Sequence, residues 1–495
     1  MTRRDWAEAA WLGFALAALF LSPLAFALDG NLYYLQWQPS HAKEVAVALP
    51  VAAIGLTGLL VAARRLQGLR GAIALAAVAA VPLLSFGVAV VRDLPAARVL
   101  IPFWEHPAIR YGAPLLTGVV VVAVLFTWPD TFRRGLISAL RFASPVSLVV
   151  CGLFVGPGTR PGPVVATDRP HPTTAGAPPE PSSCSPVLAL LFDELSFTYL
   201  YDEEMGIRPE FPRLRAFGGA ATHHLTVTAP GTDTLPALPG FLAGRRLAGV
   251  GVDRDRLMEA GPGGATPFDA RARDGLFATA RGLGFRTEMV GYYLAYCESL
   301  GDLADACRSF SFYNAASPAD RFSAWHPLLT TLILWPRQFP LGVLKNPAFA
   351  WHQGRLVAAT EREVLRPLST SRPVFRFAHF SVPHLPFAFD RHGYRPPPDP
   401  LRTAPDTYYV RQLQFVDTLV GRITDALARR GDLARSWVVV LSDHGYRFGG
   451  RERDPARVPF IVKAPGQVDR AEVRDPERAE QLLIRTVRDA CSLTQ

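Results

Sequence analysis

Cysteine is scarce in this chain: there are five among 495 residues, at positions 151, 184, 297, 307 and 491. So few cysteines exclude a disulfide-rich scaffold, and their spacing excludes a zinc-finger pattern. The sequence also shows no internal repeat. Cys297 and Cys307 flank a short acidic loop, CESLGDLADAC. If this loop is exported the two can form a disulfide, and otherwise they remain free thiols.

The chain is long and apolar. Its length exceeds one ordinary domain. Hydrophobic residues make up 49% of it, the mean hydropathy is +0.15, the formal net charge is +9 and the isoelectric point is about 9.5. A basic balance fits either nucleic-acid binding or a membrane protein with arginine-rich cytoplasmic loops. The apolar runs described next favour a membrane protein, so we expect no nucleic-acid partner.

Five long apolar runs lie in the first third of the chain, at 11–28, 46–63, 71–91, 113–128 and 136–156. Each is long enough, or nearly so, to cross about 30 Å of hydrocarbon. Charges are confined to the joints between them, which disfavours the alternative of buried helices in a soluble core. The first run also has features of a cleavable signal peptide. We favour an uncleaved anchor, and the orientation of the remainder is the same in both cases.

Arginines at alternate joints indicate the orientation of these spans. Because arginine-rich short loops stay in the cytoplasm, an odd number of spans from a cytoplasmic N-terminus places everything after residue 156 outside. We therefore predict a multi-pass protein of the bacterial inner membrane, with residues 1–156 as a bundle of five transmembrane helices. The remainder is predicted to be periplasmic or extracellular. The arginines that mark the cytoplasmic joints are Arg3, Arg4, Arg64, Arg65, Arg70, Arg133 and Arg134.

The rest of the chain divides into a linker and one large domain. Residues 157–186 are so rich in proline that we expect an extended, semi-rigid linker without helix or strand. In residues 187–495, apolar strands alternate with helices, and a helix near 407–430 has one apolar face. This pattern predicts an α/β/α sandwich with a mostly parallel sheet. The predicted strands are 187–192, 286–293, 374–380, 437–442 and 460–464.

Polar side chains follow or end three of these strands. In parallel sheets ligands bind at the carboxyl ends of the strands, and carboxylates with neutral imidazoles suit a divalent cation. Taken singly, these residues also fit a helix N-cap or a packed loop histidine. Their convergence at one sheet edge favours a site. The residues are Asp193, Glu194, His379, His384, Asp443 and His444.

Four stretches carry a resemblance to a known family: LALLFDEL, TDTLPALPGFLAG, FAHFSVPHLPF and VVVLSDHGYRFGG…RVPFIVKAPGQ. They resemble the alkaline phosphatase/sulfatase superfamily, in the family's order, over about residues 185–467. The closer likeness is to its membrane-anchored sulfatase-like branch, which includes lipoteichoic acid synthases and lipid A phosphoethanolamine transferases. Five spans before an exported catalytic domain is also the layout of those transferases.

The resemblance implies a nucleophile in the second stretch. Family members carry a nucleophile followed by x-Pro and, shortly after, a Leu-Thr-Gly turn. Thr234 precedes Leu235-Pro236, and Leu242-Ala243-Gly244 takes the later place, so the resemblance favours Thr234 over Thr232. A threonine hydroxyl at the start of a helix faces free N–H groups that favour an anion.

The resemblance also implies one divalent metal ion, because a threonine hydroxyl is a weak nucleophile without an activating group. Glu194, Thr234, Asp443 and His444 match the family's metal-binding residues, and Asp193 matches the first acid of the sulfatase Asp-Asp pair. Zn²⁺ or Mn²⁺ suits these ligands best, and Ca²⁺ or Mg²⁺ is also compatible with them.

Several positions depart from the sulfatase pattern. Thr234 cannot be oxidised to a formylglycine aldehyde, since its extra methyl group would make the product a ketone. Leu238 stands where sulfatases have an arginine, and GYYL at 291–294 replaces their Gly-Lys-x-His. Arginines follow the Asp-His-Gly sequence where the phosphoethanolamine transferases have a histidine; they are Arg447, Arg451 and Arg453.

These features predict an enzyme that transfers phosphoethanolamine or phosphoglycerol from a phospholipid donor to an envelope glycan or lipid acceptor. Thr234 is the expected nucleophile, and His384 is expected to bind or protonate the leaving oxygen. His379, Arg447 and Arg451 are expected to bind substrate. Two alternatives stay open: a cell-surface hydrolase of phosphate or sulfate esters, and a non-catalytic protein of envelope assembly.

Overall fold

The computed structural model describes most of the chain. The described residues are 2–30, 32–38, 41–93, 113–156, 166–168, 184–253, 256–270, 274–311, 313, 325–335, 345–368, 372–398, 406–448, 450–452 and 454–492. They divide into two compact units, one of residues 1–162 and 320–348 and one of residues 163–319 and 349–495. Each unit is described separately below.

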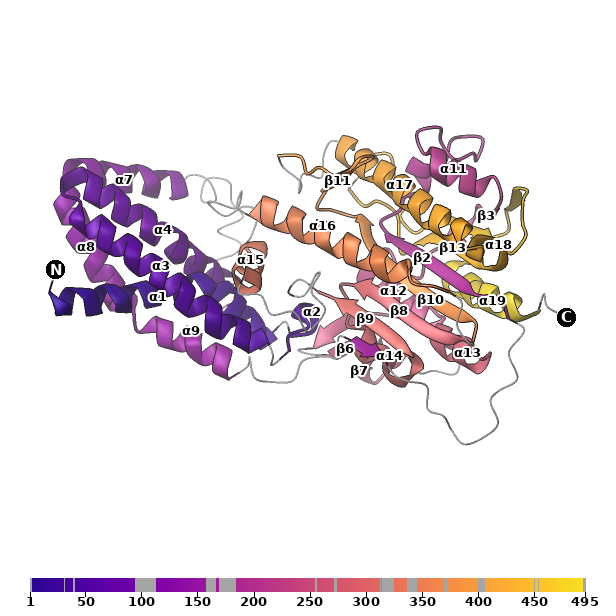
Figure 1. Cartoon of the computed structure of the whole chain (residues 1–495), viewed down its shortest axis with the longest axis horizontal. Helices are drawn as coiled ribbons and strands as arrows, with labels where there is room; N and C mark the ends of the chain where they lie inside the picture. The colour runs from indigo at the N-terminus through magenta and orange to yellow at the C-terminus, as the bar shows by residue number, and fades with distance from the viewer. Residues whose placement is uncertain are drawn as a thin grey trace. The chain divides into compact units, whose positions relative to one another are not determined.

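The first unit is helical (Figure 1). All five predicted apolar runs are mostly helical where they are described, and the last is divided between two helices by a turn at Ser144 and Pro145. Among the described residues, four segments are long and apolar enough to cross a membrane: Arg3–Leu28, His41–Arg65, Gly68–Gly87 and Pro129–Val155. The helices of this unit are α1 (Arg3–Gly30), α2 (Leu32–Leu35), α3 (His41–Arg65), α4 (Gly68–Asp93), α7 (Ala113–Thr127), α8 (Pro129–Ala143), α9 (Val146–Val155) and α15 (Trp325–Ile333).

The count of five spans is not confirmed. Helix α7 is strongly apolar but has 15 residues, which at about 1.5 Å per residue reaches about 22 Å, short of the hydrocarbon thickness. Residues 94–112, which precede it, lie outside the described residues. The last predicted run belongs to a longer segment that begins at Pro129, and its first helix, α8, also carries Arg133, Arg134 and Arg141.

Arginines from different helices converge on one glutamate in this unit. Glu8 of α1 lies 2.7 Å from Arg64 of α3 and 2.9 Å from Arg141 of α8. Arg133 of α8 donates to the carbonyl of Leu66, just after α3. The start of α1, the end of α3 and helix α8 therefore meet at the same end of the helical unit.

Helix α15 belongs to this unit although it comes from the middle of the predicted catalytic domain, 187–495. It packs against α1 and α3. His326 lies 3.3 Å from the buried Glu44 of α3, and the fully buried Trp335 donates to Ser85 of α4. Residues 320–348 therefore belong to the helical unit, whereas the residues before and after them belong to the second unit.

The second unit is built on a nine-stranded sheet, with strand order β1-β9-β8-β10-β2-β13-β14-β3-β15 (Figure 1). The run from β9 to β13 is parallel, whereas β1 and β14 pair antiparallel with their neighbours. The predicted mostly parallel sheet is thus present, and the predicted strand 460–464 is its antiparallel member. The bounds are β1 (Ala166–Asp168), β2 (Val187–Asp193), β3 (Thr222–His224), β8 (Arg286–Tyr292), β9 (Ala306–Phe310), β10 (Val374–Pro383), β13 (Trp437–Ser442), β14 (Phe460–Lys463) and β15 (Ala471–Val473).

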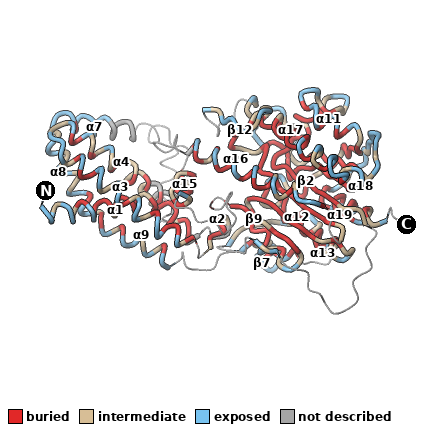
Figure 2. The backbone as a smooth tube through the Cα atoms, viewed as in Figure 1, coloured by how far each residue is buried: buried red, intermediate tan, exposed pale blue. Residues whose placement is uncertain are grey.

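Helices cover both faces of the sheet, as the contacts made by alternate residues of β10 show. Phe375 and Phe377 contact Phe277 of α13 and Phe241 of α12. Ala378 and Phe380 instead join a buried cluster with side chains of α11, α16 and α17. Successive strand residues point to opposite faces, so helices on both sides bury every residue of β10. Figure 2 shows buried backbone throughout the interior of this unit. The bounds of the helices named are α11 (Pro212–Gly218), α12 (Thr234–Ala243), α13 (Leu276–Gly282), α16 (Lys345–Val364) and α17 (Thr407–Arg429).

The smaller elements complete this unit. The helices are α10 (Phe197–Leu200), α14 (Tyr296–Leu300), the 3₁₀ turn η3 (Gly301–Leu303), α18 (Asp432–Arg435) and α19 (Ala479–Ser492), which packs against α12 and α13. The remaining strands form small sheets: β5 (Val250–Asp253), β6 (Arg256–Gly261) and β7 (Gly264–Pro267) form one, β11 (Phe389–Asp390) pairs with β12 (Gly393–Tyr394), and β4 (Val227–Thr228) with β16 (Glu477–Arg478).

Most of the predicted linker, 157–186, lies outside the described residues, but two parts of it are ordered into the second unit. Residues 166–168 form β1, at the edge of the sheet, where we expected no strand. A short stretch without proline can pair with an open edge because its backbone N–H groups are available. Cys184 is bonded to Cys491 of α19.

Two disulfides staple the second unit. The predicted Cys297–Cys307 bond is confirmed, with Cα atoms 5.6 Å apart. The Cys184–Cys491 bond was not predicted and joins residues 307 positions apart. Cys151 of α9 is the free cysteine among the described residues.

Candidate active site

The site lies at the carboxyl ends of two neighbouring parallel strands. Ser442, the last residue of β13, pairs with Phe192 of β2. Asp193, which ends β2, and Asp443, which follows β13, therefore lie side by side at this edge of the sheet. Both are buried, as is His444. The prediction that polar residues converge at one sheet edge holds for these three.

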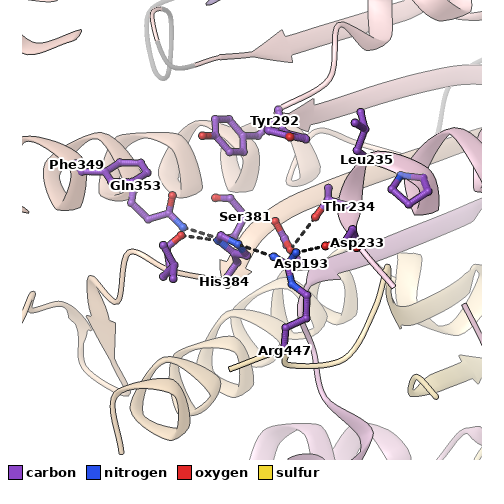
Figure 3. A pocket seen from close by; sticks show the side chains of 13 residues that line it. Asp193, Asp233, Thr234, Leu235, Tyr292, Phe349, Gln353, Ser381, His384 and Arg447 are labelled. Carbon is purple, nitrogen blue, oxygen red and sulfur yellow. Dashed lines mark hydrogen bonds and ion pairs between the residues drawn. The ribbon is translucent and has the colours of Figure 1, made fainter. Parts of the chain in front are cut away.

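Thr234 is the first residue of α12 and is directed at this pair of strand ends (Figure 3). Its Oγ1 atom lies 3.3 Å from Oδ1 of Asp193 and 3.1 Å from Nε2 of His444. Thr232 is exposed and hydrogen-bonds the adjacent Asp233. The helix begins at Thr234, so its first N–H groups, which have no partner within the helix, favour a negative charge close to the hydroxyl.

Three side chains that could hold a metal ion form a candidate metal-binding group in the same place. Asp193, Asp443 and His444 each offer one donor atom, and these three atoms lie within 4.8 Å of one another. Oδ1 of Asp443 accepts from the backbone N–H groups of Glu194 and His444. Its Oδ2 is buried and has no hydrogen-bond partner among the described residues.

The electrostatics of this group fit a cation. Burial raises the pKa of Asp193 well above its usual range, and the nearby Asp443 carboxylate raises it further. Two buried carboxylates this close repel each other unless a positive charge lies between them. His444 contacts the Gly445 carbonyl through Nδ1 at 2.9 Å. That contact fixes the proton on Nδ1 and leaves the Nε2 lone pair directed at the site. The donor set therefore fits a divalent metal ion.

Glu194 lies next to this group but is engaged elsewhere. Its Oε1 accepts from Nε of Arg447 at 2.8 Å, and its Oε2 is buried without a hydrogen-bond partner in the described part of the chain. One oxygen is thus available to a ligand from the position next to Asp193. The role of Glu194 as a metal ligand stays a prediction.

Arg447 connects Glu194 to the opening of the site. Its guanidinium forms an ion pair with Asp233, the residue before α12, and lies 3.3 Å from Nε2 of His384. Nδ1 of His384 contacts the Leu385 carbonyl at 2.6 Å, so Nε2 is the atom of this imidazole that faces the site. Arg447 and His384 therefore present a cation and an imidazole nitrogen beside Thr234 (Figure 3).

A cavity of about 490 Å³ opens over these residues. Asp193, Thr234, His384 and Arg447 line its polar side. The opposite wall is largely aromatic and amide; it was not identified from the sequence, although GYYL was noted as a departure. That wall includes Tyr292, the last residue of β8, and Phe349 and Gln353 of α16 (Figure 3). Tyr293, which follows β8, and Leu385 also line the cavity.

Two residues expected to bind substrate lie elsewhere. His379 of β10 is fully buried beneath Asp193, with Nε2 4.0 Å from Oδ2 of Asp193 and Nδ1 2.7 Å from the Tyr296 hydroxyl. Burial lowers the pKa of His379 to about 4, so it is neutral. Arg451 is exposed, and its guanidinium lies 5.9 Å from the centre of the Tyr199 ring. Neither lines the cavity, and Arg453 lies outside the described residues.

Comparison with known proteins agrees with this architecture. Residues 187–490 match the family model described as Sulfatase. None of the curated proteins compared matches this chain. Three similar solved structures show 13–18% sequence identity. Ps i-CgsB in complex with k-i-k-neocarrahexaose has 13% identity and a TM-score of 0.45, covering 62% of this chain and 72% of its own. BT1596, a 2-O GAG sulfatase, has 14% and 0.41, covering 62% and 71%. Phosphonate monoester hydrolase of Agrobacterium radiobacter has 18% and 0.40, covering 62% and 74%.

Proposed function

This chain belongs to the sulfatase family, and from that premise we propose that it is a membrane-anchored, metal-dependent phosphotransferase. It transfers a phospho-substituent, phosphoethanolamine or phosphoglycerol, from a phospholipid to a hydroxyl group of an envelope glycan or lipid. Family membership makes it an enzyme of the alkaline phosphatase superfamily. The donor, the acceptor and the transfer itself are the proposed part.

The position of Thr234 carries the proposal. Its hydroxyl lies at the first turn of a helix, 3.3 Å from Oδ1 of Asp193 and 3.1 Å from Nε2 of His444, and this position supports a role as nucleophile. Threonine cannot supply the aldehyde that sulfatases use. Direct attack by the hydroxyl on phosphorus is chemistry that this site supports without that modification.

A divalent ion held by Asp193, Asp443 and His444, with Glu194 next to them, would stabilise negative charge on the nucleophile and on the phosphoryl oxygens. Thr234 donates its hydroxyl hydrogen toward Oδ1 of Asp193 and forms the bond to phosphorus. The bond between phosphorus and the diacylglycerol oxygen breaks. Nε2 of His384, when protonated, gives its proton to that oxygen, and Arg447 binds a phosphoryl oxygen.

The second half of the reaction reverses these roles. The acceptor hydroxyl loses its proton to Nε2 of His384 and bonds to phosphorus, and the Oγ1–phosphorus bond of Thr234 breaks. If water enters instead of the acceptor, the same steps make the protein a hydrolase, which is the first alternative. The polar contacts around Thr234 argue against the second alternative, a non-catalytic assembly protein, because such a protein has no need for a buried donor set.

We further propose that the chain resides in the bacterial inner membrane with its second unit outside the cytoplasm. Four membrane-length helices support the anchor. Arg64, Arg133 and Arg141 gather at the end of the helical unit where α1 begins, as expected of a cytoplasmic end. Two disulfides in the second unit suit an oxidising compartment. A reporter fused after residue 495 that is active only in the cytoplasm would contradict this orientation.

Mass spectrometry of the full chain in membranes tests the function. After incubation with a phospholipid donor and no acceptor, we expect Thr234 to carry the mass of the donor's phospho-headgroup. Thr234→Ala is the control and should carry none. Release of free phospho-headgroup at the same rate with and without glycan or lipid acceptor would favour the hydrolase. Absence of both the adduct and turnover under metal saturation would favour the assembly protein.

A further inference from the structure

Glu194 has an unusual backbone conformation. Its φ angle is +65°, in the left-handed region that residues with a side chain rarely adopt. Glu194 directly follows β2, where successive side chains point to opposite faces of the sheet. A left-handed residue at this point breaks the alternation. The charge of the Glu194 carboxylate acts on Asp193, its Oε1 accepts from Arg447, and its Oε2 is buried without a hydrogen-bond partner in the described part of the chain. Such a conformation is strained and needs support from its surroundings.

The hydroxyl of Tyr409 supplies contacts at this bend. It donates to the backbone carbonyl of Glu194 at 2.6 Å and accepts from the backbone N–H of Ser196 at 2.9 Å. One side-chain atom therefore satisfies both main-chain groups that flank the turn. These contacts span 215 and 213 positions of sequence, because Tyr409 belongs to helix α17.

The ring of Tyr409 fixes the position of that hydroxyl. Tyr409 is fully buried. It stacks on Tyr446 with ring centres 3.8 Å apart and meets the Tyr199 ring edge-on at 5.1 Å. Tyr446 directly follows Gly445 of the Asp-His-Gly sequence after β13. Tyr409 thus contacts the segments that follow both strands that carry the metal-binding group.

We propose that Tyr409 is a positioning residue, which holds Glu194 in its left-handed conformation so that the carboxylates of Asp193 and Glu194 can serve the same metal ion. This inference rests on the metal-dependent site of the proposed function. Tyr409 lies outside the cavity lining. It acts through Glu194 and does not touch the substrate.

A Zn²⁺ titration of the full chain in detergent tests the proposal. Tyr409→Phe removes the hydroxyl and keeps the ring that stacks on Tyr446. We expect the affinity for Zn²⁺, measured by competition with a chromophoric chelator, to fall about 10- to 100-fold, as for other residues that orient metal ligands. The matched control is Tyr408→Phe, a half-buried neighbour on the same helix, which should change the affinity less than about twofold.

A double-mutant cycle separates positioning from a general structural effect. If Tyr409 acts through Glu194, Tyr409→Phe should have no further effect on Zn²⁺ affinity in a Glu194→Gln background. If the two losses instead multiply, Tyr409 acts independently of Glu194 and the proposal is wrong. Thermal unfolding of the metal-free variants, measured in parallel, shows whether Tyr409→Phe is folded. If Tyr409→Phe is unfolded, Ser196→Pro takes its place in the cycle. Ser196→Pro removes the backbone N–H that donates to the Tyr409 hydroxyl.

The remaining outcomes are equally decisive. Unchanged Zn²⁺ affinity in Tyr409→Phe overturns the proposal, and so does unchanged affinity in Glu194→Gln or absence of any Zn²⁺ or Mn²⁺ binding by the wild type. Failure of the phosphotransferase proposal is recognised separately, because a chain that forms no phospho-adduct on Thr234 can still show the expected Zn²⁺ affinities.

Discussion

Cys184 and Cys491 form a disulfide that joins the two ends of the second unit, with their Cα atoms 4.0 Å apart. Cys184 lies three residues before β2, the central strand that leads to Asp193. Cys491 lies in the last helix, α19, and the backbone next to the bond is also paired, since Ser185 donates to the Ala490 carbonyl at 2.8 Å. The loop of chain between the two cysteines therefore contains most residues of the second unit.

We predict that the Cys184–Cys491 bond contributes more stability than the Cys297–Cys307 bond. A disulfide restricts the unfolded chain more when the loop it closes is longer, and the separations are 307 and 10 residues. In the chain-entropy model the two bonds are worth about 6 and about 3 kcal/mol. Replacing each cysteine pair by serine and comparing urea midpoints of the second unit checks this order. Cys151→Ser should leave the midpoint unchanged, and a larger loss from the 297–307 pair would contradict the model.

A second prediction concerns removal of the metal. Without a cation, Asp193 and Asp443 repel each other in a buried place, so chelation should lower the Tm of the second unit and Zn²⁺ or Mn²⁺ should restore it. At a concentration 100 times the dissociation constant, binding stabilises the folded state by about 2.7 kcal/mol. Asp443→Asn should abolish most of the metal-dependent rise, whereas Asp417→Asn on α17 should keep it. A Tm that is changed neither by the chelator nor by the metal would argue against the site.

A third prediction uses His223 of β3, which is remote from the metal-binding group. Burial lowers the pKa of His223 below its usual 6.5, and the positive charge of Arg470 adds to this shift. The unfolded chain therefore binds this proton more readily, so stability falls as the pH drops through about 6.5 and stops falling below the folded pKa. His223→Gln should show a smaller loss of denaturant midpoint between about pH 7.5 and about pH 5. An equal loss in both proteins would assign the effect to other groups.

Local sequence patterns predicted much of this fold and site. The strands 187–192 and 437–442 were recognisable as buried parallel strands because they are continuously apolar. The acids that follow them then had to meet at one edge. The family resemblance of TDTLPALPGFLAG favoured Thr234, and the structure brings its hydroxyl to both Asp193 and His444.

Contacts between residues far apart in sequence could not be predicted in the same way. Nothing near Tyr409 shows that its hydroxyl meets Glu194, and nothing near Cys184 indicates Cys491. His379 was expected in the substrate site because it lies near the end of a predicted strand whose end carries polar residues. Alternation along β10 instead buries it beneath Asp193. The apolar sequence of helix α15 would also suit a core helix of the second unit. Its place in the helical unit depends on contacts with α1 and α3.

The last prediction concerns the nucleophile itself. Thr234→Ala should reduce turnover by several orders of magnitude and leave folding and membrane insertion intact. The side chain is small, and its covalent route is what the variant loses. Thr232→Ala is the matched control, because Thr232 is exposed and bonds only weakly to Asp233, at 3.4 Å. It should retain most of the activity. Rates with a phospholipid donor, measured on chains of equal metal content, check both variants.

Thr234→Ser sharpens this test because it keeps a hydroxyl within reach of Asp193 and His444. Measurable activity in Thr234→Ser, with a phosphoserine adduct in place of phosphothreonine, would show that the hydroxyl is the reacting group. Leu238 stands where sulfatases carry an arginine, so we expect the serine to stay unmodified rather than become formylglycine. Full activity in Thr234→Ala with none in Thr232→Ala would mean that the register is wrong by two residues. Full activity in both alanine variants would remove the nucleophile assignment, and the transferase mechanism with it.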